Sequence, residues 1–392
     1  MQNSQLSDKK STMKIPTPAY VVYEDRLRRN LQLLKETERE CGVKIIMALK
    51  ANALWRTFDI VKDYFNSATA SSTNEMHLAN EFLGGDVHAY CPVYTEETFQ
   101  EFLRGCSHIT FNSLFQFEKF KDTLKSYEDE TGRHISCGLR VNPKCSVVKT
   151  DIYNPAIPGS RFGLSEDKVP ECLPKEIEGL HFHALCESGP EELKDVLEKF
   201  EKDFGYLLSS MKWVNFGGGH LITRKDYDRK RLKQIISGFK EKYPNLEIIM
   251  EPGSAFTWET GDLLVKVLDV VEDSGIATAI IDASFACHMP DCLEMPYRPA
   301  IQEALQGDKT SEYKYRLGGN SCLSGDFVGD WYFSTPLVPG RILTLLDMNH
   351  YTTVKTHMFN GISHPSIWLV KSDGDIQLLR EFTYEDYKSR MS

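Results

Sequence analysis

Polar side chains stand at the ends of short apolar runs in this 392-residue sequence. Such runs are typical of buried parallel strands, and a barrel built from them carries its functional groups at the carboxyl ends of the strands. We therefore expect these side chains to gather at one end of a barrel. They are Lys50 after 43–49, Arg140 and Asn142 near the end of 136–141, His183 within 179–185, Gly217, Gly218 and Gly219 after 213–216, and Glu251 after 246–250.

Lys50 is the candidate nucleophile. A lysine at the end of an apolar strand is poorly hydrated, which lowers its pKa and makes the neutral amine available. A neutral amine is what a Schiff base with an aldehyde requires. Considered alone, Lys50 could also be a strand-end lysine that reaches solvent.

The other groups complement such an amine. Three consecutive glycines leave backbone N–H groups uncovered for a phosphate, although they could equally form a tight turn. Glu251 needs a cationic partner, which a protonated pyridine nitrogen or an arginine would provide. His183 offers a flat ring, or it is an ordinary core histidine. Together these groups indicate a pyridoxal 5'-phosphate site.

The elements that position these groups alternate along the chain. Eight strand candidates are separated by helical patterns, including 73–82, 96–104, 114–127, 191–209 and 227–243. This rhythm predicts an α/β fold with a (β/α)8 barrel at 36–262. After residue 262 the runs 263–271, 277–281, 314–317, 331–333, 341–346 and 366–370 are separated by Gly, Pro, Asn and Asp. They predict a β-rich domain of residues 1–35 and 263–392, completed by an N-terminal strand near 18–22.

Composition excludes several classes of protein. The net charge of −10 argues against a nucleic-acid or anionic-membrane partner. No stretch has the roughly 20 apolar residues of a membrane span, and the polar segment from Met1 to Thr12 lacks the apolar core of a signal peptide. The ten cysteines show no metal-ligand spacing, so we expect free thiols, no metal and a cytoplasmic protein.

Four ordered motifs resemble those of the alanine-racemase-fold decarboxylases, which include diaminopimelate, ornithine and carboxynorspermidine decarboxylases. The motifs are Ala48-Leu49-Lys50-Ala51-Asn52, Gly179-Leu180-His181-Phe182-His183, Gly217-Gly218-Gly219 and Glu251-Pro252-Gly253. The resemblance implies that Lys50 carries the cofactor, His183 stacks on it, and Glu251 holds its ring nitrogen. The phosphate would be bound by Gly217, Gly218, Gly219, Gly253 and Tyr351.

The resemblance also implies a homodimer with shared active sites. Cys322 matches a cysteine that the partner subunit contributes, and it is the candidate proton donor to the substrate's α-carbon. Arg161 stands where relatives have a lysine that pairs with an aspartate across the interface, and Asp326 matches that aspartate. We therefore expect an Arg161–Asp326 pair between subunits.

The substrate expectation rests on departures from the pattern. The residue after the cysteine is acidic in ornithine and diaminopimelate decarboxylases, whereas here it is Leu323. Leu185-Cys186-Glu187, Asp282-Ala283-Ser284-Phe285 and Gly325-Asp326-Phe327 look most like carboxynorspermidine decarboxylase. Its substrate is a polyamine bearing one α-carboxylate, and carboxylates must hold the other ammonium groups. The candidates are Glu187, Asp291 and Glu294.

The expected activity is therefore decarboxylation of carboxynorspermidine or carboxyspermidine, which forms norspermidine or spermidine. A diaminopimelate or other basic amino-acid decarboxylase is one alternative, and an amino-acid racemase on the same fold is another. A third is a regulatory protein that kept the fold and lost the activity. Retention of Lys50, His183, Glu251 and Cys322 argues against this last alternative.

Overall fold

The computed structural model describes residues 15–148 and 150–392, so the polar segment Met1 to Thr12 lies outside the described residues. The chain divides into a barrel unit, Arg29–Phe256, and a sheet unit, which joins the described residues up to Arg28 with Thr257–Ser392. The predicted bounds, 36 and 262, both fall inside secondary-structure elements, namely helix α2 (Glu24–Cys41) and strand β11 (Gly261–Asp273). No helix of the described ranges is long and apolar enough to cross a membrane.

The barrel unit is a sheet of parallel strands in the order β2-β10-β9-β8-β7-β6-β5-β4-β3. Strands β2 (Lys44–Ile45) and β3 (Met47–Ala48) stand at opposite ends of this order, where β2 pairs with β10 and β3 pairs with β4. Only Ile46 separates them in the chain, so this one run of chain closes the sheet. This closure confirms the predicted (β/α)8 barrel. The remaining strands are β4 (Ala68–Ala70), β5 (Val87–Tyr90), β6 (His108–Phe111), β7 (Ser136–Arg140), β8 (Ile177–His181), β9 (Trp213–Asn215) and β10 (Glu247–Met250).

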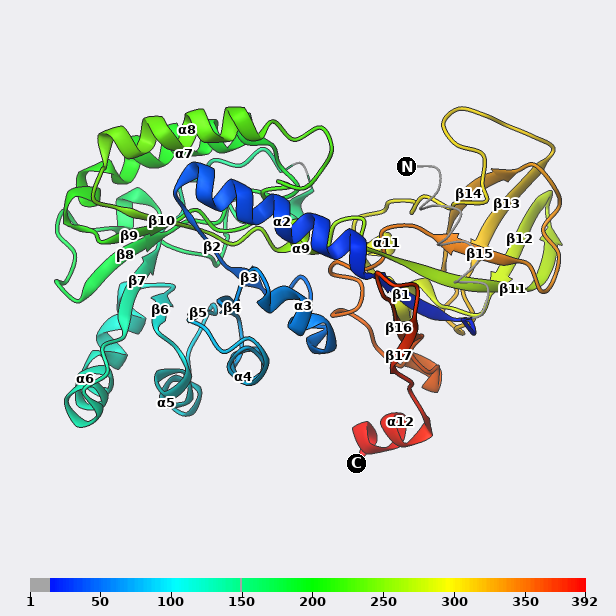
Figure 1. Cartoon of the computed structure of the whole chain (residues 1–392), viewed down its shortest axis with the longest axis horizontal. Helices are drawn as coiled ribbons and strands as arrows, with labels where there is room; N and C mark the ends of the chain where they lie inside the picture. The colour runs from blue at the N-terminus through cyan, green and yellow to red at the C-terminus, as the bar shows by residue number, and fades with distance from the viewer. Residues whose placement is uncertain (1–14, 149) are drawn as a thin grey trace. The chain divides into compact units, whose positions relative to one another are not determined.

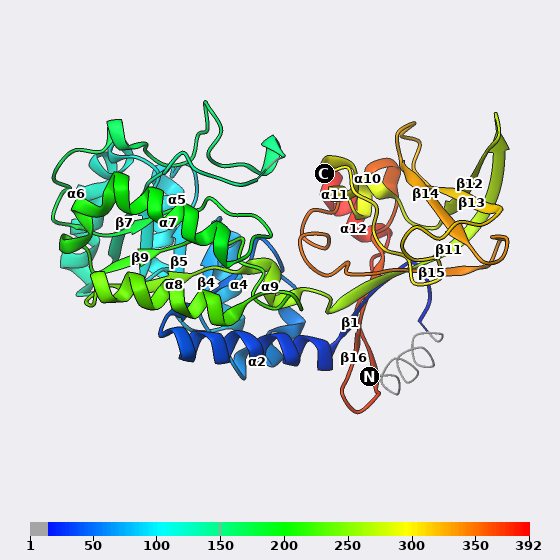
Figure 2. The ribbon, with the colours of Figure 1, turned by 90° about the horizontal axis from the view of Figure 1, so that it is seen from above.

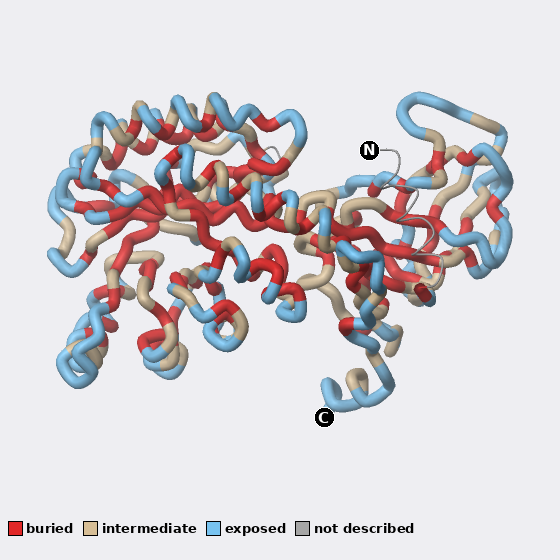
Figure 3. Tube along the Cα trace, viewed as in Figure 1, coloured by how far each residue is buried: buried red, intermediate tan, exposed pale blue. Residues whose placement is uncertain are grey.

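Helices surround these strands, and Figures 1 and 2 show α4 to α8 on the outside of the barrel. Within this unit the strands are buried and the helices expose their outer faces, as Figure 3 shows. In the described residues, only short 3-10 turns, Asp151–Tyr153 and Glu166–Lys168, interrupt the loop between β7 and β8. The barrel helices are α3 (Phe58–Lys62), α4 (Thr73–Phe82), α5 (Glu96–Gly105), α6 (Leu114–Thr131), α7 (Pro190–Phe204), α8 (Arg229–Lys242) and α9 (Gly253–Thr257).

The sheet unit is built around a mixed sheet of order β14-β13-β12-β11-β1-β16-β17, with β15 also paired to β11. The N-terminal strand β1 (Ala19–Tyr23) completes this sheet, as predicted, and it pairs antiparallel with β11 and parallel with β16. Its five residues are all buried, which explains why this segment completes the sheet. The other strands are β12 (Ile276–Ile281), β13 (Tyr313–Gly318), β14 (Phe327–Phe333), β15 (Ile342–Leu345), β16 (Ser366–Val370) and β17 (Ile376–Arg380); the helices are α10 (Phe285–His288), α11 (Asp291–Glu294) and α12 (Tyr384–Met391).

Candidate active site

Lys50 lies just beyond β3, at the carboxyl end of the barrel strands. Burial lowers the pKa of its ammonium, and Arg140 lowers it further, while Glu251 and Glu75 oppose the shift. A lysine whose pKa is lowered in this way supplies the neutral amine that attacks an aldehyde.

Glu251 follows β10 and is 4% exposed. Its Oε1 atom accepts a hydrogen bond of 2.7 Å from Nδ2 of Asn215, at the end of β9. Burial raises the pKa of the carboxyl, while Lys50, Asn215 and Thr69 act in the opposite direction. A buried carboxylate in this setting needs a cationic partner, which a protonated ring nitrogen supplies.

His183 lies two residues beyond β8, because that strand ends at His181 rather than continuing to residue 185 as predicted. Its Nδ1 atom accepts a hydrogen bond of 3.2 Å from the Gly218 N–H, so the imidazole proton sits on Nε2. Burial holds the pKa of His183 well below its usual value, and the charges of Lys50 and Arg140 act in the same direction. The ring is therefore neutral, and its flat face is suited to packing against an aromatic cofactor.

The three glycines after β9 allow this turn to pack closely against the neighbouring backbone. A side chain at Gly218 or Gly219 would place Cβ within 2.5 Å of the Glu251 oxygen or 2.2 Å of the Leu185 oxygen. Gly217 and Gly219 also have φ angles of +69° and +89°, which favour glycine.

Three of the four glycine N–H groups predicted to bind phosphate have acceptors inside the chain. Gly217 donates to Oδ1 of Asn215 and Gly218 to His183. Gly253 donates to the Glu251 carbonyl at 2.7 Å. A phosphate would have to share these donors, so among the four glycines Gly219 is the candidate that needs no such sharing.

Two further buried residues lie at the same barrel end: Arg140, which was expected there but was given no role, and His181, which was not among the predicted site residues. Arg140 ends β7 and stacks its guanidinium on Tyr90 and Phe162, at 4.5 and 4.6 Å from the ring centres. His181 ends β8, and neither of its ring nitrogens has a hydrogen-bond partner among the described residues. Buried imidazoles are normally satisfied, so polar groups of a bound cofactor are suitable partners for His181.

A metal ion is a second candidate ligand for the cluster formed by His181, His183 and Glu251. Ligand atoms of His181, His183 and Glu251 lie within 4.8 Å of one another. A metal-bound histidine normally donates its second N–H to an acceptor. His183 instead receives an N–H at Nδ1 and carries its own proton on Nε2, so it has no lone pair ready for a metal. The donor set fits pyridoxal 5'-phosphate better, with an amine, a buried anion and a neutral ring.

Cys322, predicted as the proton donor, lies in the sheet unit. It is exposed in the loop between β13 and β14, and its backbone N–H donates to Oδ1 of Asn360 at 2.8 Å. Asp326 ends the same loop and is buried. Its carboxylate accepts hydrogen bonds from the Ala286 N–H and from both the N–H and the hydroxyl of Ser321, so it anchors the loop internally.

The remaining predicted residues are distributed over both units. Arg161, in the barrel unit, is exposed and lies over Phe162, 4.4 Å from the ring centre. Glu187, also in the barrel unit, is exposed with a φ of +47°. Tyr351, in the sheet unit, has a φ of +54°.

Asp291 and Glu294 lie together in α11 of the sheet unit. The structure pairs both carboxylates with the ammonium of Lys355. An internal cation therefore already occupies the carboxylates that were predicted to hold the substrate.

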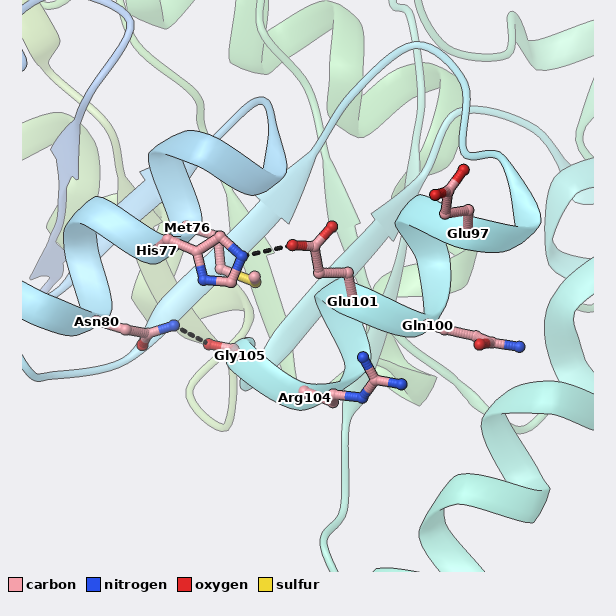
Figure 4. Close-up of a pocket in the computed structure, with 8 residues that line it drawn as sticks. All are labelled: Met76, His77, Asn80, Glu97, Gln100, Glu101, Arg104 and Gly105. Carbon is pink, nitrogen blue, oxygen red and sulfur yellow. Dashed lines mark hydrogen bonds and ion pairs between the residues drawn. The ribbon is translucent and has the colours of Figure 1, made fainter.

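A separate cleft of about 470 Å³ is formed by α4 and α5 on the barrel (Figure 4). His77 contacts Glu101 at 2.5 Å across it, and Asn80 donates to the Gly105 carbonyl at 3.1 Å. All its lining residues belong to these two helices, so it contains none of the candidate site residues.

The fold and the site define a barrel enzyme of the pyridoxal-phosphate class, and comparisons identify its family. The family model "Pyridoxal-dependent decarboxylase, C-terminal sheet domain" matches residues 20–349. The chain is 41% identical to carboxyaminopropylagmatine decarboxylase of Synechocystis sp., covering 100% of this chain and 98% of that protein. It is 38% identical to carboxynorspermidine/carboxyspermidine decarboxylase of Campylobacter jejuni, covering 96% and 99%.

Solved structures agree. Carboxynorspermidine decarboxylase of Campylobacter jejuni, solved with norspermidine, matches with a TM-score of 0.86 and 37% identity over 96% of this chain and 100% of that one. Diaminopimelate decarboxylase of Helicobacter pylori shares the fold, with a TM-score of 0.82 at 18% identity over 98% of each chain. The chain belongs to the pyridoxal-dependent decarboxylases, and pyridoxal 5'-phosphate is its cofactor.

Proposed function

We propose that this enzyme decarboxylates carboxynorspermidine and carboxyspermidine, forming norspermidine and spermidine in polyamine biosynthesis. The similarity to the Campylobacter jejuni enzyme over nearly the whole of both chains carries this proposal. Leu323 supports it, because the position after Cys322 lacks the acid expected for ornithine or diaminopimelate. The diaminopimelate decarboxylases of Methanocaldococcus jannaschii and Haemophilus influenzae are 22% and 28% identical to this chain.

The barrel residues are proposed to prepare the cofactor. Pyridoxal phosphate supplies the electron sink for the electron pair left when CO2 departs. Lys50 offers its neutral amine to hold the cofactor and later to release the product. Glu251 holds the proton on the ring nitrogen, and His183 packs its neutral ring against the cofactor face.

Cys322 is proposed to replace the lost carboxylate with a proton. Each turnover breaks one carbon–carbon bond and forms one carbon–hydrogen bond, so it consumes one proton at the α-carbon. The Cys322 thiol is exposed on its loop, which suits delivery to a site outside its own loop. The Asn360 and Asp326 hydrogen bonds would fix that loop during the transfer.

We further propose a homodimer in which Cys322 completes the partner's site and Arg161 pairs across the interface with Asp326, whose buried carboxylate it would share with Ala286 and Ser321. Arg161 is exposed, which leaves its guanidinium accessible to a second subunit. The ten cysteines form no disulfide within the chain, which suits a cytoplasmic location, where thiols stay reduced.

The substrate is tested by measuring CO2 release from five compounds in parallel. These are carboxynorspermidine, carboxyspermidine, carboxyaminopropylagmatine, diaminopimelate and ornithine. We expect the first two to be used most efficiently. Carboxyaminopropylagmatine is the second candidate, because the relative named for it is 41% identical over the whole chain. A clear preference for that compound would replace the proposed substrate and leave the decarboxylase chemistry in place.

Sharing of active sites is tested with mixed dimers. Lys50→Ala and Cys322→Ala are each expected to inactivate the enzyme. If Lys50 and Cys322 of one site come from different subunits, random mixing restores about a quarter of the wild-type activity. If both come from the same subunit, mixing restores nothing and the shared-site proposal fails.

A further inference from the structure

Asn215 links two parts of the site through one side chain. It ends β9 and is 2% exposed. Its Oδ1 atom accepts the Gly217 N–H at 2.8 Å, and its Nδ2 atom donates to Oε1 of Glu251 at 2.7 Å. The backbone N–H requires an oxygen opposite it, so the amide can face Glu251 only with its NH2 group.

We propose that Asn215 is a positioning residue that keeps Glu251 ionised and aimed at the cofactor, an inference that rests on the proposed role of Glu251. Burial by itself favours the neutral, protonated carboxyl, and the charges of Lys50 and Arg140 and a hydrogen bond from Thr69 oppose it beside Asn215. The imidazoles of His181 and His183 also face Glu251, within 4.8 Å. An NH2 donor held against Oε1 favours the ionised form, because a proton on that oxygen would face another donor. The amide therefore directs any proton away from Oε1 and restricts rotation of the carboxylate.

The same turn also sets the state of His183. The Gly217 N–H orients Asn215, and the N–H of the next residue, Gly218, donates a hydrogen bond to Nδ1 of His183. Asn215, Gly217 and Gly218 thus specify an ionised carboxylate and a neutral imidazole. The neighbouring glycines allow this turn to pack closely against the Glu251 and His183 backbones.

Asn142 is the matched residue for comparison, because its hydrogen bonds are those of a purely structural asparagine. It follows β7, is also buried, and its Oδ1 atom accepts the N–H two residues later, from Lys144, at 3.0 Å. Its amide, however, donates to the Pro155 and Phe162 carbonyls, each at 2.9 Å. The two asparagines therefore make the same local turn, and only Asn215 contacts an ionisable group of the site.

The test compares Asn215→Asp with Asn142→Asp in the cofactor-loaded enzyme. Asn215→Asp places a second carboxylate beside Oε1 of Glu251, and two such groups cannot both remain ionised. We expect kcat at neutral pH to fall about 10- to 100-fold, in line with loss of a hydrogen bond to a charged group. The acid limb of the kcat profile should move up by about one pH unit or more, since Glu251 now gains its proton at higher pH.

A second readout is independent of turnover. The absorption of the bound cofactor, titrated against pH without substrate, should also shift its midpoint in Asn215→Asp and not in Asn142→Asp. Asn215→Ala removes the donor without adding a charge, and it serves if the aspartate variant does not fold. Equal midpoints for Asn215→Asp and the wild type, or equal shifts in both aspartate variants, would overturn the inference.

Glu251→Gln separates this inference from the role on which it rests. If Asn215 acts through Glu251, Asn215→Asp causes no further loss of kcat in the Glu251→Gln background. A full additional loss there would show an independent structural effect and overturn the inference. If Glu251→Gln alone leaves kcat and the titration midpoint unchanged, the role of Glu251 itself fails, and the inference fails with it.

Discussion

Lys50 and Lys44 lie on the same run of chain, Lys50 beyond its carboxyl end and Lys44 at its amino end. Only Lys50 belongs to the candidate site, because Lys44 pairs with Asp86 at 2.8 Å. We predict that Lys50→Ala abolishes both CO2 release and borohydride fixation of the cofactor to the chain. Lys44→Ala should retain both, as mass spectrometry of the reduced protein would show. Fixation that survives in Lys50→Ala would contradict the assignment.

The lowered pKa of Lys50 also predicts how cofactor capture depends on pH. The amine reacts only when deprotonated, so capture by cofactor-free enzyme should accelerate with pH and level off below the pKa of about 10.4 of a free lysine. Glu251 raises the pKa of Lys50, so Glu251→Gln should move the plateau to lower pH. Stopped-flow absorbance over about pH 6 to 10 measures this. A plateau that moves to higher pH in Glu251→Gln would contradict the electrostatic argument.

At the scale of elements, the turn after β9 and helix α8 place glycines in opposite settings. A Cβ at Gly219 would meet the Leu185 carbonyl at 2.2 Å with a φ of +89°, whereas one at helical Gly238 would meet nothing within 4 Å. Gly219→Ala should therefore lower the free energy of unfolding by about 2 kcal/mol or more. Gly238→Ala should raise it by about 0.5–1 kcal/mol. Urea unfolding measures both, and similar changes in the two variants would refute the steric argument.

Helix α11 carries the proposed ammonium site, which Lys355 occupies in the structure. A substrate ammonium must displace or share this internal cation. We predict that Lys355→Met lowers KM for carboxynorspermidine about three- to tenfold, and that Asp291→Asn raises it. Lys314→Met is the control, since Lys314 pairs with Asp330 on neighbouring strands of the same unit. Unchanged KM in all three variants would remove α11 from the substrate site.

The elements that the sequence specified best are those with local signals. The predicted helix 73–82 matches α4, and Ser72 caps it by accepting the Glu75 N–H at 3.2 Å. The Glu75 carboxylate accepts the Ser71 N–H rather than the N–H of the N-cap residue Ser72, so this helix start is not a capping box. Strand β8 ends earlier than its apolar run, since buried loop residues are as apolar as strand residues. Strand β17 was missed because most of its short sequence is exposed.

The site residues likewise divide into those with a local sequence signal and those without one. Lys50, Glu251 and the three glycines stood out because such residues are unusual at the ends of apolar strands. Asn215 did not, because an asparagine at the end of a short strand, two residues before a glycine turn, is an ordinary turn residue. The pairing of Lys355 with Asp291, 64 residues apart in the chain, has no local signal. Only the fold brings these partners together.

The whole molecule adds a field that individual residues do not supply. Its net charge is −10, and the proposed substrate has more ammonium groups than carboxylates. Such a field raises the encounter rate of a cation, and salt screens it as the Debye length falls from about 20 Å to about 4 Å between roughly 0.02 and 0.5 M. We therefore predict that kcat/KM for carboxynorspermidine falls several-fold over this range, while kcat stays nearly constant.

The salt dependence could instead come from α11 alone, and one variant separates the two sources. Asp291→Asn combined with Glu294→Gln removes two of the negative charges and leaves the rest of the field. If the field of the whole chain draws in the substrate, this variant has a higher KM but retains most of the wild-type salt dependence. If its kcat/KM becomes insensitive to salt, the attraction is local to α11 and the excess of acidic residues elsewhere does not contribute to substrate capture.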